Sequence, residues 1–166
     1  MSNPAYKTHF LQIGNIKYAH HYEHPDQGHV DCPNDCRPDG MRTTENTAVN
    51  ACTDNCNGGH SQTIVLIHGY PDTSYTFRHL MPHLLACGYT VIAPDSAGFG
   101  NTVADNVESN YSVKQNAVLV AKLCEAYSIK RVVLVGHDFG SVVAQSVLHW
   151  FPDLVTAICC ISVQIS

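Results

Sequence analysis

Between residues 63 and 163 the sequence alternates short apolar runs with longer segments of helical apolar spacing. A continuous apolar run is typical of a strand covered on both faces, and apolar residues three or four apart indicate a helix. These patterns predict strands at Thr63–Ile67, Thr90–Ala93, Arg131–Val135 and Val155–Val163, and helices at Tyr75–Cys87, Ser112–Tyr127 and Gly140–Phe151. The order predicts an α/β fold: a mostly parallel sheet with right-handed crossovers and helices on both faces.

The residues before this alternation divide into two parts. In residues 1–23, two apolar-polar alternating runs between Thr8 and Tyr22 flank Gly14-Asn15, which predicts a β-hairpin. Residues 24–62 are polar and lack any periodicity, so we interpret them as an insertion that is disordered or loop-like. The chain has 166 residues, enough for one core, and we expect the hairpin and residues 63–166 to share it.

Four of the eight cysteines fall in the polar segment, namely Cys32, Cys36, Cys52 and Cys56. Their paired spacing is compatible with structural zinc, but the segment offers no apolar residues to pack around a metal. Zinc ligation, disulfides and an untethered insertion all stay open; we favour the insertion and expect neither a metal nor a cofactor. Cys159 and Cys160 lie within the last predicted strand, where we expect them to be small core residues.

Charge and hydropathy exclude several classes of partner. The formal net charge is −5, and Lys and Arg are not clustered, so we expect no nucleic-acid binding. The sequence contains no run of about 18 apolar residues, so no membrane span is predicted. The first residues lack the basic and apolar segments of a secretory signal, so we expect a cytoplasmic protein that does not bind membranes.

Three segments follow directly on predicted strands: His68–Pro71, Pro94–Gly100 and Gly136–Gly140. Ligands bind at the carboxyl ends of parallel strands, so chemistry is expected there. In the third segment a glycine stands two residues before and two residues after Asp138, between a strand and a helix. This arrangement predicts a nucleophile elbow, a turn so sharp that a Cβ at either flank would clash.

Three longer stretches, TIVLIHGYPDTSYTFRHLMPHL, VIAPDSAGFGNT and VVLVGHDFGSVVAQSVLHWFP, resemble the α/β-hydrolase fold, in its epoxide hydrolase and haloalkane dehalogenase branch. The resemblance covers residues 63–163 well and residues 8–22 weakly. It implies that Asp138 is a nucleophile that forms an alkyl-enzyme ester, which a histidine-activated water then hydrolyses. It also implies that the backbone N–H groups of Tyr70 and Phe139 stabilise the oxyanion, and that His68 is structural.

The residue after the nucleophile distinguishes the members of this branch. Haloalkane dehalogenases place a tryptophan there, whose indole N–H holds the halide, and fluoroacetate dehalogenases place an arginine. The side chain of Phe139 has neither an indole N–H nor a guanidinium group. We therefore expect a small hydrophobic epoxide as substrate, opened to a diol, and regard a dehalogenase as the weaker alternative.

The resemblance also implies that the cap helices, the base histidine and the later strands follow the last strand seen here. We therefore expect only the N-terminal part of such a domain, inactive as an isolated chain, with a non-catalytic relative of the same fold as the alternative. The last strand would then be a sheet edge, at which we expect self-association.

Overall fold

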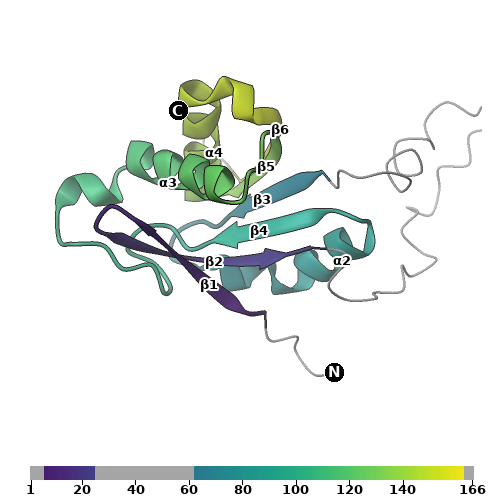
Figure 1. Ribbon diagram of the computed structural model, residues 1–166, viewed down its shortest axis with the longest axis horizontal. Helices are drawn as coiled ribbons and strands as arrows, with labels where there is room; N and C mark the ends of the chain where they lie inside the picture. Colours follow the sequence, from purple (N-terminus) through teal and green to yellow (C-terminus); the bar gives the residue numbers. More distant parts are fainter. Residues whose placement is uncertain (1–5, 25–61, 163–166) are drawn as a thin grey trace, which may run out of the picture.

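The computed structural model describes residues 6–24 and 62–162, which form one six-stranded sheet flanked by helices (Figure 1). The strands are β1 (Thr8–Ile13), β2 (Ile16–Glu23), β3 (Thr63–Ile67), β4 (Thr90–Pro94), β5 (Val132–His137) and β6 (Val155–Ile161). Their order across the sheet is β1-β2-β4-β3-β5-β6. β4, β3, β5 and β6 are parallel, whereas β2 is antiparallel to both β1 and β4. The predicted mostly parallel α/β sheet is confirmed.

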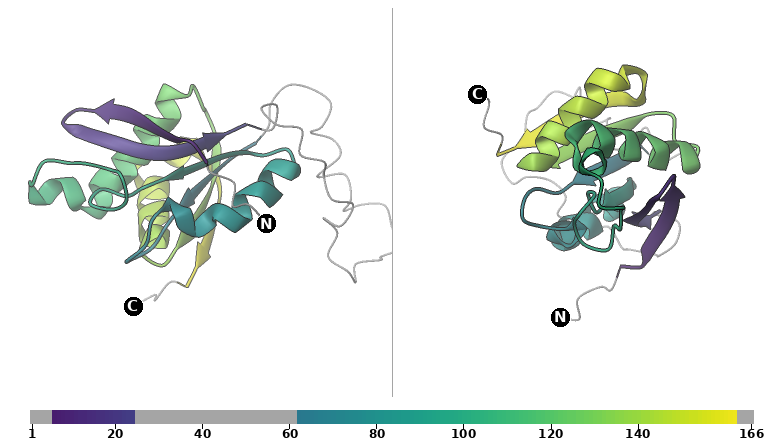
Figure 2. Two further views of the ribbon diagram at one scale, coloured as in Figure 1. Left: turned by 90° about the horizontal axis from the view of Figure 1, so that it is seen from below. Right: turned by 90° about the vertical axis from the view of Figure 1, so that its left-hand side faces the viewer.

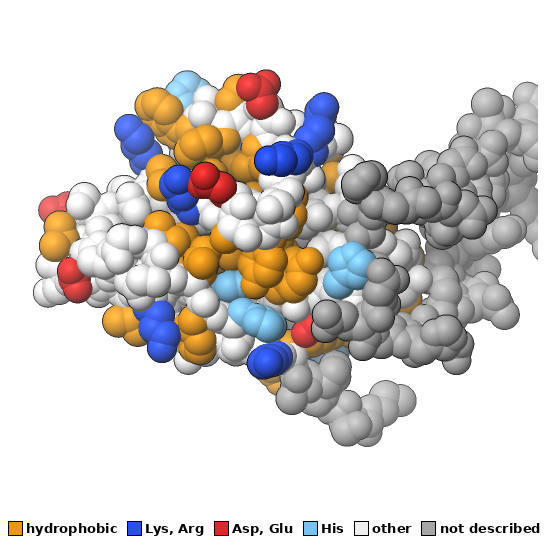
Figure 3. Space-filling model, viewed as in Figure 1, with side chains coloured by type: hydrophobic (Ala, Val, Ile, Leu, Met, Phe, Trp, Pro, Cys, Tyr) orange, Lys and Arg blue, Asp and Glu red, His pale blue; other side chains and the backbone are white. Residues whose placement is uncertain are grey.

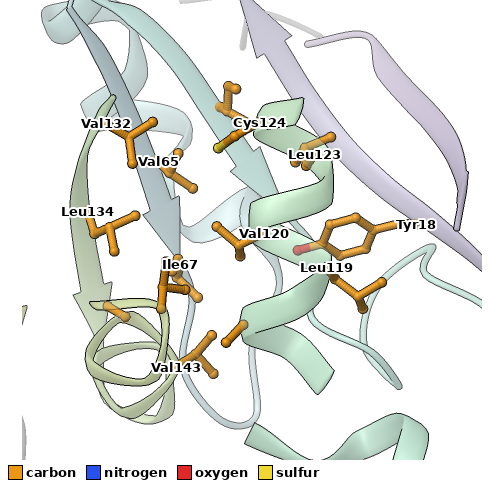
Figure 4. Close-up of a cluster of buried hydrophobic side chains, with 14 of the residues drawn as sticks. Tyr18, Val65, Ile67, Leu119, Val120, Leu123, Cys124, Val132, Leu134 and Val143 are labelled. Carbon is orange, nitrogen blue, oxygen red and sulfur yellow. The ribbon is translucent and has the colours of Figure 1, made fainter. Parts of the chain in front are cut away.

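The helices are α2 (Leu80–Ala86), α3 (Val113–Ala126) and α4 (Phe139–Trp150), with short 3₁₀ segments η2 (Ser74–His79), η3 (Glu108–Tyr111) and η4 (Pro152–Leu154). They cover both faces of the sheet (Figure 2). Successive side chains of a strand point to opposite faces, so β3 supplies both cores. Val65 and Ile67 pack with α3 and α4, whereas Ile64 and Leu66 pack with η2 and α2. Figure 4 shows the first core, in which Tyr18 of the hairpin meets Leu119 and Val120 of α3.

Several predicted elements are found within a few residues of their predicted bounds. The hairpin turns at Gly14, whose φ of 59° is in the left-handed region that glycine adopts readily. α3 begins as expected at Ser112, whose side chain accepts a hydrogen bond from the Gln115 N–H. This satisfies one of the amide groups that a helix start leaves unpaired. Apolar side chains reach the surface where the hairpin meets α3 (Figure 3).

The helix predicted over Tyr75–Cys87 is wrong in its first half, which is the 3₁₀ segment η2. Pro82 explains the late start of α2. A proline has no N–H to donate to the carbonyl of Arg78 and is tolerated only in the first helical turn. The Tyr6 hydroxyl donates to that carbonyl instead, at 3.3 Å. Gly88, with a φ of 84°, follows the end of α2.

The expectation that Cys159 and Cys160 are core residues is wrong, because both side chains are exposed. Among the described residues β6 pairs only with β5, so it is the edge strand that the sequence predicts, and little packs over it. Cys124 of α3, by contrast, is buried, and burial raises the pKa of its thiol to about 12. Cys32, Cys36, Cys52 and Cys56, with most of the predicted insertion, lie outside the described residues. No helix in the described ranges has the length and apolar character needed to cross a membrane.

Candidate active site

Asp138 lies at the sharp turn between β5 and α4. Its φ of 51° and ψ of −120° are unusual for a residue with a side chain. Both flanking glycines are required by close backbone approach. A Cβ on Gly136 would lie 2.5 Å from the carbonyl oxygen of Gly140, and a Cβ on Gly140 would overlap the carbonyl oxygen of Ile67. The turn thus packs directly against the end of β3.

The Asp138 carboxylate is exposed and bonded by backbone donors from two loops. The Tyr70 N–H donates to Oδ1 at 2.9 Å. This hydrogen bond and a second one from the Phe139 N–H hold the pKa of Asp138 below its ordinary value. The carboxylate is therefore ionised at neutral pH, and it lies at the amino end of α4, where a negative charge is favoured. The Tyr70–Pro71 peptide bond is cis.

His68 joins the loop after β3 to the loop after β4. Its ring is fully buried, Nε2 accepts a hydrogen bond from the Ser96 N–H at 2.9 Å, and Nδ1 lies 2.8 Å from the Gly69 carbonyl oxygen. Because Nε2 accepts, the proton of the neutral ring must be on Nδ1, which donates to Gly69. Both nitrogens are thereby used within the protein, which leaves neither for a water or a substrate.

Asp95, which the sequence analysis did not single out, organises the loop after β4. Its buried carboxylate accepts hydrogen bonds from the Ser74 N–H at 2.9 Å, from the Ser74 hydroxyl at 2.6 Å and from the Asn101 N–H at 2.9 Å. A Cβ on Gly100 would overlap this carboxylate. An aspartate at a strand end, followed by glycines, was the only sequence signal for this role.

A pocket of about 360 Å³ lies beside the two residues whose N–H groups bond Asp138. It is lined by Tyr70, Ala97, Gly98, Phe99, Tyr111 and Phe139. Two of these residues, Tyr70 and Phe139, also donate their backbone N–H groups to Asp138, so the pocket borders the carboxylate. Phe99 and Tyr111 were not identified from the sequence, because the strand pattern does not show that η3 returns to this edge.

No histidine in the described ranges is hydrogen-bonded to Asp138. His137 precedes it on β5 and is partly exposed, and His20 is buried on β2 against Tyr127 of α3. The predicted residues Asp138, Tyr70, Phe139 and His68 are therefore brought to one edge of the sheet, without a base among them.

Residues 62–165 match the family described as alpha/beta hydrolase fold. The chain belongs to that family. Among its curated relatives, epoxide hydrolase B of Mycobacterium tuberculosis is 32% identical over 117 residues, which are 70% of this chain and 33% of the relative. Epoxide hydrolase 2 of Siraitia grosvenorii is 35% identical over 106 residues, 64% of this chain and 34% of the relative. This α/β hydrolase chain thus spans about a third of the length of these relatives.

Solved structures agree on the fold. An epoxide hydrolase from Vigna radiata superposes with a TM-score of 0.72 at 21% identity, over 99% of this chain and 42% of that one. Epoxide hydrolase A from Mycobacterium thermoresistibile gives a TM-score of 0.68 at 20% identity, over 94% of this chain and 39% of that one. At this identity the likeness supports the α/β-hydrolase fold alone. The curated relatives named above are epoxide hydrolases, each matched over about a third of its length.

Proposed function

We propose that Asp138 is the nucleophile of an epoxide-opening reaction. Its carboxylate attacks a ring carbon of the epoxide, a new C–O ester bond forms, the ring C–O bond breaks, and the ring oxygen takes a proton. Water then adds to the ester carbonyl and releases a diol. A carboxylate that is ionised at neutral pH needs no base for the first step.

The observation that carries this proposal is the pair of backbone donors on Asp138. The Tyr70 N–H, 2.9 Å from Oδ1, and the Phe139 N–H bond the carboxylate before reaction. In the ester, the same donors would face the carbonyl oxygen, where negative charge develops when water adds. The donor whose position is known, the Tyr70 N–H, bonds Oδ1.

The second step needs a base that activates water. His68 cannot serve, because both of its nitrogens are bonded to backbone groups. We therefore expect the 166-residue chain to form the ester and to release diol slowly or not at all.

Incubation of the purified chain with styrene oxide, followed by mass spectrometry of peptides, tests the proposal. Exposed thiols such as those of Cys159 and Cys160 also react with epoxides, so only esters on carboxylates are compared. We expect one such ester, on Asp138, that is absent from Asp138→Asn. Asp153→Asn, which removes an exposed carboxylate on η4, is the matched control and should keep the adduct. Equal labelling of several carboxylates, or an adduct that persists in Asp138→Asn, would contradict the proposal.

The two alternatives from the sequence give different results in the same assay. A non-catalytic protein forms no ester on Asp138 with either electrophile. A dehalogenase forms the ester from a 1-haloalkane and releases halide. Phe139 lines the pocket with a side chain that has no polar hydrogen to hold a halide, which favours the epoxide over the haloalkane.

A further inference from the structure

The pocket beside Asp138 is walled by aromatic rings from four separate segments. Tyr70 follows β3, Phe99 lies in the loop after β4, Tyr111 ends η3, and Phe139 begins α4. The Tyr70 and Phe99 rings meet edge to face, with centroids 5.9 Å apart and planes at 85°. Phe99 is supported from behind by the buried His68 ring, at 5.5 Å and 71°. The position of Phe99 is thus tied to the same histidine that joins the two loops.

Tyr111 closes the opposite side of the pocket. Its ring lies so close to Gly98 that a Cβ there would be only 3.0 Å from it. The Tyr111 hydroxyl lies 3.4 Å from the carbonyl oxygens of both Ala104 and Asp105, to which it donates. The hydroxyl of Tyr111 is therefore hydrogen-bonded within the protein, and its ring is the part that lines the pocket.

The residues that line the pocket favour binding of a planar apolar group. None of the lining residues is an acid, a histidine, a lysine or an arginine. A closed apolar cavity of about 150 Å³ holds a benzene molecule, so this open pocket of about 360 Å³ has room for one ring. Aromatic rings prefer edge-to-face and offset contacts with other rings, and the existing walls already show this geometry.

We propose that this pocket binds the aryl substituent of an aryl epoxide, and that Tyr111 determines the preference for it. The inference rests on the proposed role of Asp138, because the pocket shares Tyr70 and Phe139 with the site of that residue. A ring bound there holds the epoxide carbons against the carboxylate. Tyr111 touches only the substituent, so it affects which epoxide reacts rather than the reactivity of Asp138.

The test is a competition for alkylation of the full chain between styrene oxide and cyclohexyloxirane, which is similar in size but not planar. We expect Tyr111→Ala to lower the ratio of aryl to cyclohexyl adduct on Asp138 about fivefold, which corresponds to about 1 kcal/mol. Tyr111→Phe, which keeps the ring, and Phe10→Ala, which removes an exposed ring on the hairpin, should leave the ratio within about twofold. If Tyr111→Ala does not fold, Tyr111→Leu is used in its place.

Benzyl alcohol, which cannot alkylate, separates this inference from the proposed function. Ligand-observed NMR should show that it binds the wild-type chain and Asp138→Asn, and that Tyr111→Ala weakens binding about fivefold. Adducts on Asp138 with a ratio unchanged in Tyr111→Ala would overturn the aryl pocket and leave the nucleophile intact. Binding of benzyl alcohol that depends on Tyr111, without any adduct, would support the pocket and overturn the role of Asp138. Binding that is insensitive to Tyr111→Ala would also overturn the pocket.

Discussion

Protonation of His20 should destabilise the fold in mild acid. The side chain is 2% exposed, and Nε2 lies 2.7 Å from the Tyr127 hydroxyl of α3. Nδ1 is buried and has no hydrogen-bond partner among the residues that the structure describes. The Tyr127 ring contacts the His20 ring edge-on and stacks on Tyr22, with centroids 4.2 Å apart. Burial, with smaller repulsion from His9 and His21, lowers the pKa of His20 to about 4.

The magnitude follows from the difference between the folded and unfolded states. An unfolded histidine has a pKa near 6.5, so the difference is about 2.5 pKa units, each equivalent to about 1.4 kcal/mol. The folded pKa is the lower one, so the unfolded chain binds the proton first as the pH falls. Stability is unaffected above pH 6.5 and falls below it. At pH 4 the loss from this residue is about 3 kcal/mol.

Urea unfolding of the full chain at several pH values between 7 and 4 measures this loss. Other groups also titrate in this range, so the comparison is with His20→Gln, whose amide can still bond Tyr127 but takes up no proton. We expect the free energy of unfolding to fall by about 3 kcal/mol more in wild type than in the variant. His83→Gln, at an exposed histidine of α2 that does not act on His20, should follow wild type. If the free energy of unfolding falls equally with pH in wild type and in His20→Gln, the reasoning is refuted.

Three further substitutions test the geometry of the site and its supports by urea unfolding at pH 7. Gly140→Ala should destabilise by about 2 kcal/mol or more, because its Cβ meets the backbone carbonyl of Ile67, which cannot move without shifting β3; an unchanged midpoint would contradict this contact. Asp95→Asn should lower the free energy of unfolding by about 2 kcal/mol. Its amide nitrogen would replace an acceptor oxygen and face groups that are themselves donors. Asp105→Asn, on the surface loop, is the control. Ser112→Ala should cost about 1 kcal/mol through loss of the N-cap of α3, and Ser112→Asp should restore it.

The strands and helices could be predicted because their signals are local. Thr63–Ile67 is apolar throughout since both faces of the sheet are covered, and all five of its residues are buried as that pattern indicates. The Ser112 cap and the Gly14 turn depend on neighbouring residues in the chain. The close approach of backbone atoms to Gly136 and Gly140 could also be predicted, because so sharp a turn leaves no space for a Cβ at either position.

The features that sequence analysis missed depend on contacts between distant segments. The 3₁₀ start of η2 involves Ser74 and Asp95, which are 21 residues apart in the sequence. The exposure of Cys159 and Cys160 was missed because an apolar run does not reveal that little of the described chain packs over the faces of β6. Tyr111 reaches the pocket only because Gly98 leaves space for its ring.

The hydrogen bonds at this edge make Asp138 and the neighbouring pocket parts of one unit. His68 bonds the loop after β3, which carries Tyr70, to the loop after β4, which carries Phe99. Asn116 of α3 accepts from the Ala97 N–H at 2.8 Å and so ties that second loop to the helix layer. A shift of either loop would therefore move a donor to Asp138 and a wall of the pocket together. In the proposed reaction, attack by Asp138 and orientation of the substrate would be coupled through His68, although neither of its nitrogens is available to the substrate.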